Sequence, residues 1–125
     1  MNAPTEKIGT PVEKIRNFHA ELKTIRRDIH AHPELAFQEN RTSDLVAARL
    51  DGWGVEVHRG LAKTGVVGVI KGRKSASGRG IGLRADMDCL PMHETNDFPH
   101  RSTHAGRMHA CGHDGHTTML LGAAR

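Results

Sequence analysis

The chain has 125 residues, a length that suits one modest domain or a part of one. Its net charge of +4 is scattered along the sequence, and aromatic residues make up only 3% of it. A chain with neither a basic block nor a set of aromatic stacking platforms is a poor candidate for binding nucleic acid. The first ten residues lack the apolar core of an export signal, and no apolar run reaches membrane-spanning length. We therefore expect a cytoplasmic protein without a membrane partner.

The first part of the chain has the apolar spacing of helices. Apolar residues recur at alternating steps of three and four at Ile15, Phe18, Leu22, Ile25 and Ile29. This spacing predicts one helix over about residues 12–31, which Pro33 ends. A second helix of about three turns is predicted before Gly52 and Gly54. The polar residues that could cap its start are Asn40, Thr42 and Ser43.

Strand-like segments occupy the middle of the chain. The apolar and β-branched segments are VEVH (55–58), TGVVGVIKG (64–72) and IGLRADMD (81–88). We predict a strand for each, with residues 72–80 as a hairpin loop. Residues 90–108 contain two prolines and no periodic pattern, which predicts a long loop of the kind that carries function. A last helix is predicted over 113–125, and we expect the chain to stop within it because no capping residue follows.

The densest group of possible metal ligands is MHACGHDGHT, residues 108–117. His109, Cys111 and His113 alternate, so an extended backbone would point them the same way, and thiolate with imidazole suits zinc or a similar metal. The set is incomplete, because catalytic zinc takes at least three protein ligands. Loop histidines and an Asp114 side chain that caps the last helix are the alternative interpretation. The local spacing leaves both interpretations open.

Two aspartates stand at the end of the third predicted strand. Asp86 and Asp88 are two residues apart, so their side chains share a face, at a strand end where α/β proteins commonly place their chemistry. They could steady a metal-bound histidine. For Asp86 the alternative is a salt bridge to Arg84 or Arg107.

Four segments carry a family resemblance: RRDIHAHPELAFQE (26–39), TGVVGVIKG (64–72), GLRADMDCLPMHE (82–94) and GRMHACGHDGHTTMLLGAA (106–124). With them the chain resembles the amidohydrolase branch of the M20 metallopeptidases, which includes hippurate hydrolases and auxin-conjugate hydrolases. The resemblance implies an α/β fold, the N-terminal part of a zinc-peptidase-like catalytic domain with helices packed on a mixed sheet. We expect a flexible N-terminus over 1–11 and a portion of that domain over 12–125, without the lid or dimerisation domain.

The resemblance also implies a reaction and a site. Members of the family hydrolyse the amide bond of N-acyl amino acids or conjugates at a pair of divalent metals, Zn, Mn or Co. Cys111 and His113 then correspond to metal ligands, and Asp88 to the carboxylate that orients a metal-bound histidine. Candidates for supporting groups around the ligands are Asp86, His109 and His116.

Other polar residues receive structural roles. We expect Cys89 to be a buried small side chain, and we expect the two cysteines to be free thiols or a metal ligand instead of a disulfide. His30 and His32 are expected to fix the end of the first helix. Histidines expected to be ordinary surface or loop residues are His19, His58, His93, His100 and His104.

The family's general-base glutamate and remaining ligands lie downstream of the matched segments. We therefore expect these 125 residues alone to be inactive and poorly folded, and the full-length protein to be a homo-oligomer acting on a small N-acyl amino acid or conjugate. One alternative is a non-catalytic metal-binding or interaction module formed by a truncated gene product. Another is a hydrolase that uses Cys111 as nucleophile with His113 or His116.

Overall fold

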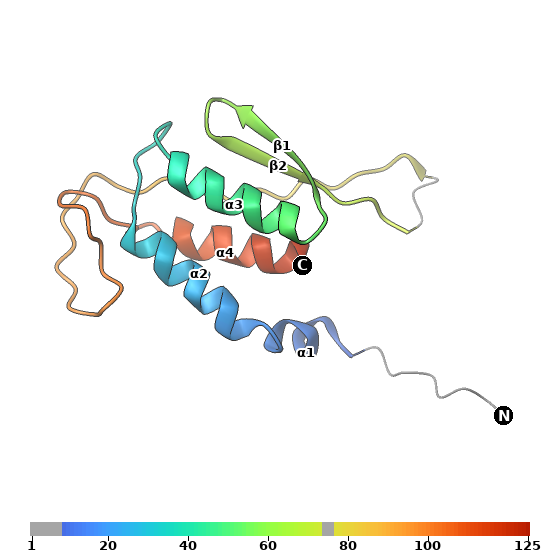
Figure 1. Cartoon of the computed structure of the whole chain (residues 1–125), viewed down its shortest axis with the longest axis horizontal. Helices are drawn as coiled ribbons and strands as arrows, with labels where there is room; N and C mark the ends of the chain where they lie inside the picture. Colours follow the sequence, from blue (N-terminus) through green and yellow to red (C-terminus); the bar gives the residue numbers. More distant parts are fainter. Residues whose placement is uncertain (1–8, 74–76) are drawn as a thin grey trace.

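The structure is a computed structural model that describes residues 9–73 and 77–125. Its elements in chain order are α1 (Pro11–Arg16), α2 (His19–Ala31), α3 (Asn40–Gly52), β1 (Glu56–Leu61), β2 (Gly65–Val69) and α4 (His113–Ala124). Figure 1 shows α2, α4 and α3 side by side, with the β1–β2 hairpin beside α3. The predicted α/β class is confirmed. Most of the N-terminus predicted to be flexible, residues 1–11, lies outside the described residues.

The single helix predicted over 12–31 is two helices, α1 and α2. The backbone amides of Asn17 and Phe18 donate to carbonyls only three residues back, which tightens the last turn of α1. Phe18 then leaves helical geometry, with φ −121° and ψ 16°. None of the residues of α1 is buried, so no core contact keeps it in line with α2. The prediction was wrong because apolar spacing indicates which side chains share a helix face, and does not indicate whether the backbone hydrogen bonds run without a break. The predicted end at Ala31 is confirmed.

The core lies where α2, α3 and α4 meet. Its buried apolar side chains are Leu22, Ile25, Ile29, Val46, Leu50 and Leu121. Gly122 lets α4 approach α2 closely, because a Cβ at that position would lie 2.8 Å from Leu22 Cδ1. Cys89 is buried and both cysteines are free, as predicted.

The start of α3 is capped from outside the helix. The Glu34 carboxylate accepts hydrogen bonds from the backbone amides of Arg41 and Thr42, at 2.9 and 2.7 Å, and from the Thr42 hydroxyl at 2.7 Å. The residue at the N-cap position is Glu39, and it makes no side-chain capping bond. The expectation that Asn40, Thr42 or Ser43 caps the helix was wrong, because Glu34 reaches the same amides from the preceding loop.

The sheet of the described residues is one antiparallel hairpin. β1 pairs with β2 so that Glu56 lies opposite Val69, and the turn between them holds Ala62 and Lys63 at positive φ. The third predicted strand, 81–88, is not formed, since it has no partner strand among the described residues to satisfy its backbone. The mixed sheet that the resemblance implies is therefore not seen in this part of the chain. Residues 74–76 of the predicted hairpin loop lie outside the described residues, and the described residues around them connect no paired strands.

The missing strand pairing leaves apolar surface open. A cleft of about 920 Å³ is bordered by β2, residues 81–88, α3 and α4. Ile81 and Leu83 on its rim are 91% and 70% exposed. Contiguous exposed apolar surface of this kind favours association with other molecules.

The long loop predicted over 90–108 is confirmed. An antiparallel bridge between Leu90 and Met108 closes its base, with N–H to O distances of 2.9 and 3.0 Å. Figure 1 shows this loop at the end of the molecule where α2 finishes and α4 begins. In the described ranges 9–73 and 77–125, no helix combines the length and apolar character needed to cross a bilayer.

The exposed cleft predicts the behaviour of the 125-residue chain by itself. It should bind the dye 1-anilinonaphthalene-8-sulfonate and aggregate on heating, because Ile81 and Leu83 cannot be buried by the described elements. Ile81→Ser with Leu83→Ser should lower the dye fluorescence. The control Val12→Ser with Ile15→Ser, on α1 outside the cleft, should not. A sharp, reversible melt of a monomer that binds no dye would contradict this expectation.

Candidate metal centre

His113 and Asp88 meet as the resemblance implied. His113 Nδ1 lies 2.8 Å from the Asp88 backbone oxygen and 3.0 Å from Asp88 Oδ1. Both partners are acceptors, so Nδ1 carries the proton and donates it. The lone pair of His113 is then on Nε2, where it can bind a further partner. A carbonyl or carboxylate behind one ring nitrogen is the usual support of a metal-binding histidine.

Cys111 is placed by the turn that starts α4. It is an exposed free cysteine, and Gly112 follows it with φ +85°, a left-handed conformation that favours glycine. Gly112 is also the N-cap residue, and its carbonyl accepts the His116 amide at 3.0 Å. The turn therefore leaves Cys111 in the loop and His113 in the first helical turn. Within the described part of the chain, no group of three or more His, Cys, Asp or Glu side chains could hold a metal ion.

Asp86 is engaged elsewhere. Its Oδ1 accepts a hydrogen bond from Arg84 Nε at 2.8 Å, and this contact lowers the pKa of the Asp86 carboxyl below its ordinary value. Its backbone carbonyl accepts the Thr117 hydroxyl at 3.0 Å. The salt-bridge alternative for Asp86 is therefore formed with Arg84. His116 is exposed, with its ring 5.9 Å from that of His113.

His109 is buried instead of facing solvent. It is 4% exposed, and neither of its ring nitrogens has a hydrogen-bond partner among the described residues. Burial lowers the pKa of His109, which favours the neutral imidazole. Asp114 does not cap α4 through its side chain, so that alternative is wrong. Its carboxylate points instead into the interior, where it is 1% exposed.

The sequence analysis missed a buried polar network behind the site. His30 Nδ1 lies 2.9 Å from Asp114 Oδ2, and His30 Nε2 lies 3.0 Å from Glu94 Oε1. Arg26 Nε approaches the same Asp114 oxygen at 3.3 Å. The expected place of His30 at the end of its helix agrees with these contacts. Its partners were not predicted because they lie 84 and 64 residues away along the chain.

The two carboxylates of the network favour a positively charged His30. Burial lowers the pKa of His30, but the hydrogen bonds to Glu94 and Asp114 outweigh it and raise that pKa above 6.5. Burial raises the pKa of Glu94, but hydrogen bonds from His30, Asn96 and Ser102 outweigh it and lower that pKa to about 2. An ionised carboxylate lies at each ring nitrogen of His30, so both nitrogens act as donors, which favours the imidazolium form. The network joins α2, the long loop and the first turn of α4.

Known proteins match this chain in sequence. Residues 82–125 match the model of peptidase family M20/M25/M40. The chain is 50% identical over 114 residues to hippurate hydrolase of Campylobacter jejuni, an alignment that covers 91% of this chain and 29% of that protein. It belongs to peptidase family M20. It is also 46% identical over 112 residues to IAA-amino acid hydrolase ILR1-like 5 of Arabidopsis thaliana, which covers 90% of this chain and 25% of that protein.

A solved M20 structure agrees with the fold. The YXEP protein of Bacillus subtilis, described as a dinuclear metal binding peptidase from the M20 family, matches with a TM-score of 0.79 and 43% identity. The match covers 87% of this chain and 30% of that one. This M20 chain thus spans less than a third of the length of these relatives.

The His30 network predicts how the stability of this M20 protein depends on pH. The raised pKa of His30 stabilises the fold fully below pH 6.5, and this contribution is lost as the pH rises through the raised value. The lowered pKa of Glu94 stabilises it above pH 4.5, and this contribution is lost as the pH falls toward 2. The network should therefore stabilise the protein most between pH 4.5 and 6.5.

The measurement is the free energy of unfolding in urea across pH, for wild type and His30→Gln at the protein's natural length. The difference should be largest between pH 4.5 and 6.5 and reach about 3 kcal/mol, the cost of breaking a buried ion pair. The control His58→Gln removes an exposed histidine and should change little. A difference that does not vary with pH would contradict the charged state of His30.

Proposed function

We propose that this protein is a metal-dependent amidohydrolase that cleaves the amide bond of N-acyl amino acids, with hippurate-like compounds as its substrates. The observation that carries the proposal is the His113–Asp88 contact next to Cys111, in a chain 50% identical over 114 residues to a hippurate hydrolase. The name of the plant relative, an IAA-amino acid hydrolase, supports the same class of substrate, an acyl group joined to an amino acid.

Cys111 and His113 fit a divalent metal. A thiolate and an imidazole with a free Nε2 are ligands suited to zinc, and manganese and cobalt are the other ions we propose. When bound, the metal pair supplies Lewis-acid activation of water and of the amide carbonyl. Asp88 holds the proton on His113 Nδ1, which keeps the Nε2 lone pair directed outward. Gly112 sets the turn from Cys111 to His113.

The quaternary structure and location of the protein belong to the same proposal. We propose a cytoplasmic homo-oligomer whose ligand is a small N-acyl amino acid or conjugate. The 125 residues alone are proposed to be inactive, because Cys111 and His113 are two ligands and catalytic zinc takes at least three from protein.

A second candidate is a non-catalytic metal-binding module. It would use the two ligands that this part of the chain offers, the exposed thiol of Cys111 and Nε2 of His113. Tight stoichiometric binding of zinc to the 125-residue chain, lost in Cys111→Ser, would support this module. A cysteine nucleophile is less well supported, since the solved relative at 43% identity is described as a dinuclear metal binding peptidase. Inactivation by alkylation with saturating metal, together with insensitivity to chelators, would support that mechanism.

The first test is hydrolysis of hippurate by the protein at its natural length, loaded with manganese or zinc. Cys111→Ser and His113→Ala should each lower kcat/KM by about 100-fold or more, because each removes a proposed metal ligand. The control Cys89→Ala removes the buried thiol, which we place outside the site, and should change kcat/KM by no more than about twofold. Failure to hydrolyse hippurate or any other N-acyl amino acid would contradict the proposed activity.

The second test separates the two neighbouring aspartates. Asp88→Asn should weaken zinc binding by about 10- to 100-fold, because the carboxylate behind His113 is lost. Asp86→Asn, which changes a side chain paired with Arg84, should alter zinc affinity by no more than about twofold. Competition with a chelating dye measures both constants. Equal losses of zinc affinity in the two variants would contradict a specific role of Asp88 in supporting His113.

A further inference from the structure

A second cavity lies between α2 and the long loop, and neither proposed ligand, Cys111 or His113, lines it. Asp114, the residue after His113, does line it and is paired there with Arg26 and His30. Its volume is about 250 Å³, and none of its lining residues borders the larger cleft that contains His113 and Asp88. One wall is a face of α2, where Lys23, Arg26, Arg27 and His30 follow one another at helical spacing. We call this cavity the basic pocket.

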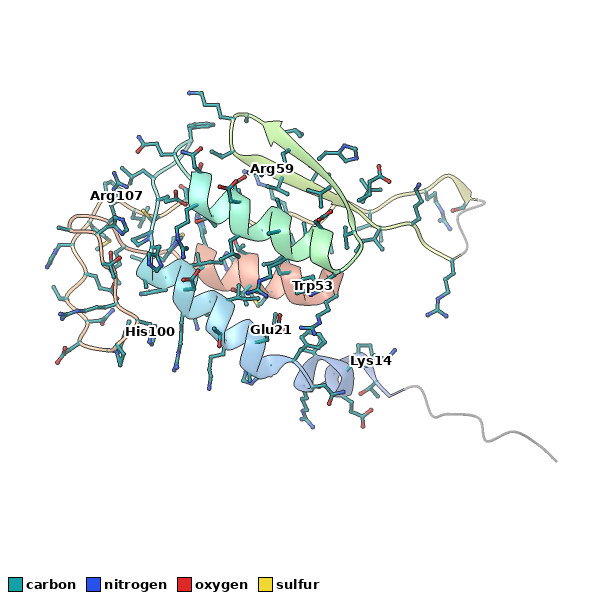
Figure 2. The ribbon with its side chains drawn as sticks, viewed as in Figure 1. Lys14, Glu21, Trp53, Arg59, His100 and Arg107 are labelled. Atoms are coloured by element: carbon teal, nitrogen blue, oxygen red, sulfur yellow. The ribbon has the colours of Figure 1, made fainter. Side chains whose placement is uncertain are left out.

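The other wall of the basic pocket is a pair of stacked rings. Phe98 and His100 stack with centroids 4.1 Å apart, and the His100 ring lies 5.8 Å from that of His30. Figure 2 labels His100 among the side chains of the long loop. His100 was expected to be an ordinary loop histidine, but the stack leaves it half-buried. The long loop therefore covers part of the basic face of α2, and the two together form a concave surface.

The charges of the basic pocket do not cancel. Arg26 pairs with Asp114, and His30 is shared between Asp114 and Glu94. Lys23 and Arg27 are exposed and have no ion-pair partner among the described residues. Burial lowers the pKa of His100, and the nearby positive charges of Arg27, His30 and Arg26 lower it further. The basic pocket therefore has two uncompensated cations beside a neutral imidazole.

We propose that the basic pocket binds a phosphate group between Lys23, Arg27 and His100. Two uncompensated cations match the charge of a phosphate dianion, and ammonium and guanidinium groups make charge-assisted hydrogen bonds to its oxygens. His100 can donate one ring N–H to the same anion. The group is either free inorganic phosphate or the end of a phosphate monoester, and the pocket volume suits either.

The test is calorimetric titration of the protein at its natural length with inorganic phosphate, at constant ionic strength. Saturable binding is expected, and Lys23→Glu with Arg27→Glu should weaken it by about tenfold or more. The control Lys14→Glu with Arg16→Glu makes the same change of net charge on α1 and should weaken it by no more than about twofold. Equal losses in both variants, or no saturation in wild type, would overturn the proposal.

Two further measurements locate the anion. Cys111→Ser should leave phosphate affinity within about twofold, and loss of binding in that variant would assign the phosphate to the metal centre and overturn the proposal. In NMR spectra of the wild type, saturating phosphate should shift the resonances of the His100 ring protons. The variant with Lys23→Glu and Arg27→Glu should not show this shift. Glycerol 3-phosphate serves as the monoester probe. Tighter binding of the monoester supports a metabolite as the source, and tighter binding of inorganic phosphate supports the free ion.

Discussion

The buried charge of His30 is the constraint on which the rest of the structure depends. An imidazolium in the interior is costly unless it is paired, and here Asp114 and Glu94 each accept one of its N–H groups, with side chains only 1% and 2% exposed. The three residues come from α2, the long loop and α4. Losing one carboxylate would leave a buried charge only partly compensated, so each segment fixes the other two. Apolar packing adds to the contact of α2 with α4 but does not reach the loop.

The same constraint determines where the proposed metal ligands lie. In the first turn of α4, the buried side chain of Asp114 is hydrogen-bonded to His30. The preceding residue, His113, is hydrogen-bonded to Asp88. Neighbouring side chains of one turn are thus held from two directions. Gly112 then turns the chain so that Cys111 is exposed beside them. The His113 ring is therefore oriented by Asp88 before any ion binds.

Sequence patterns predicted what local interactions determine. The end of the first helix at Ala31, the long loop and the start of α4 follow from proline, composition and apolar spacing. The strand over 81–88 failed because a strand exists only with a partner, and composition does not report whether one is present. The predicted cap of α3 was wrong for a similar reason, because the Glu34 carboxylate of the preceding loop accepts the hydrogen bonds of the first helical amides.

The site residues also differ in whether local sequence could predict them. Cys111 and His113 were identified because they alternate in one short segment, but this spacing left a metal site and a helix cap as equal alternatives. Only the family resemblance paired His113 with Asp88. His30 was expected to have a local role, and its two partners could not be predicted because they are 64 and 84 residues distant. Those partners also explain the basic pocket. Asp114 and Glu94 neutralise His30 and Arg26 from below, so the charges of Lys23 and Arg27, which face solvent on the same helix, are left for an anion.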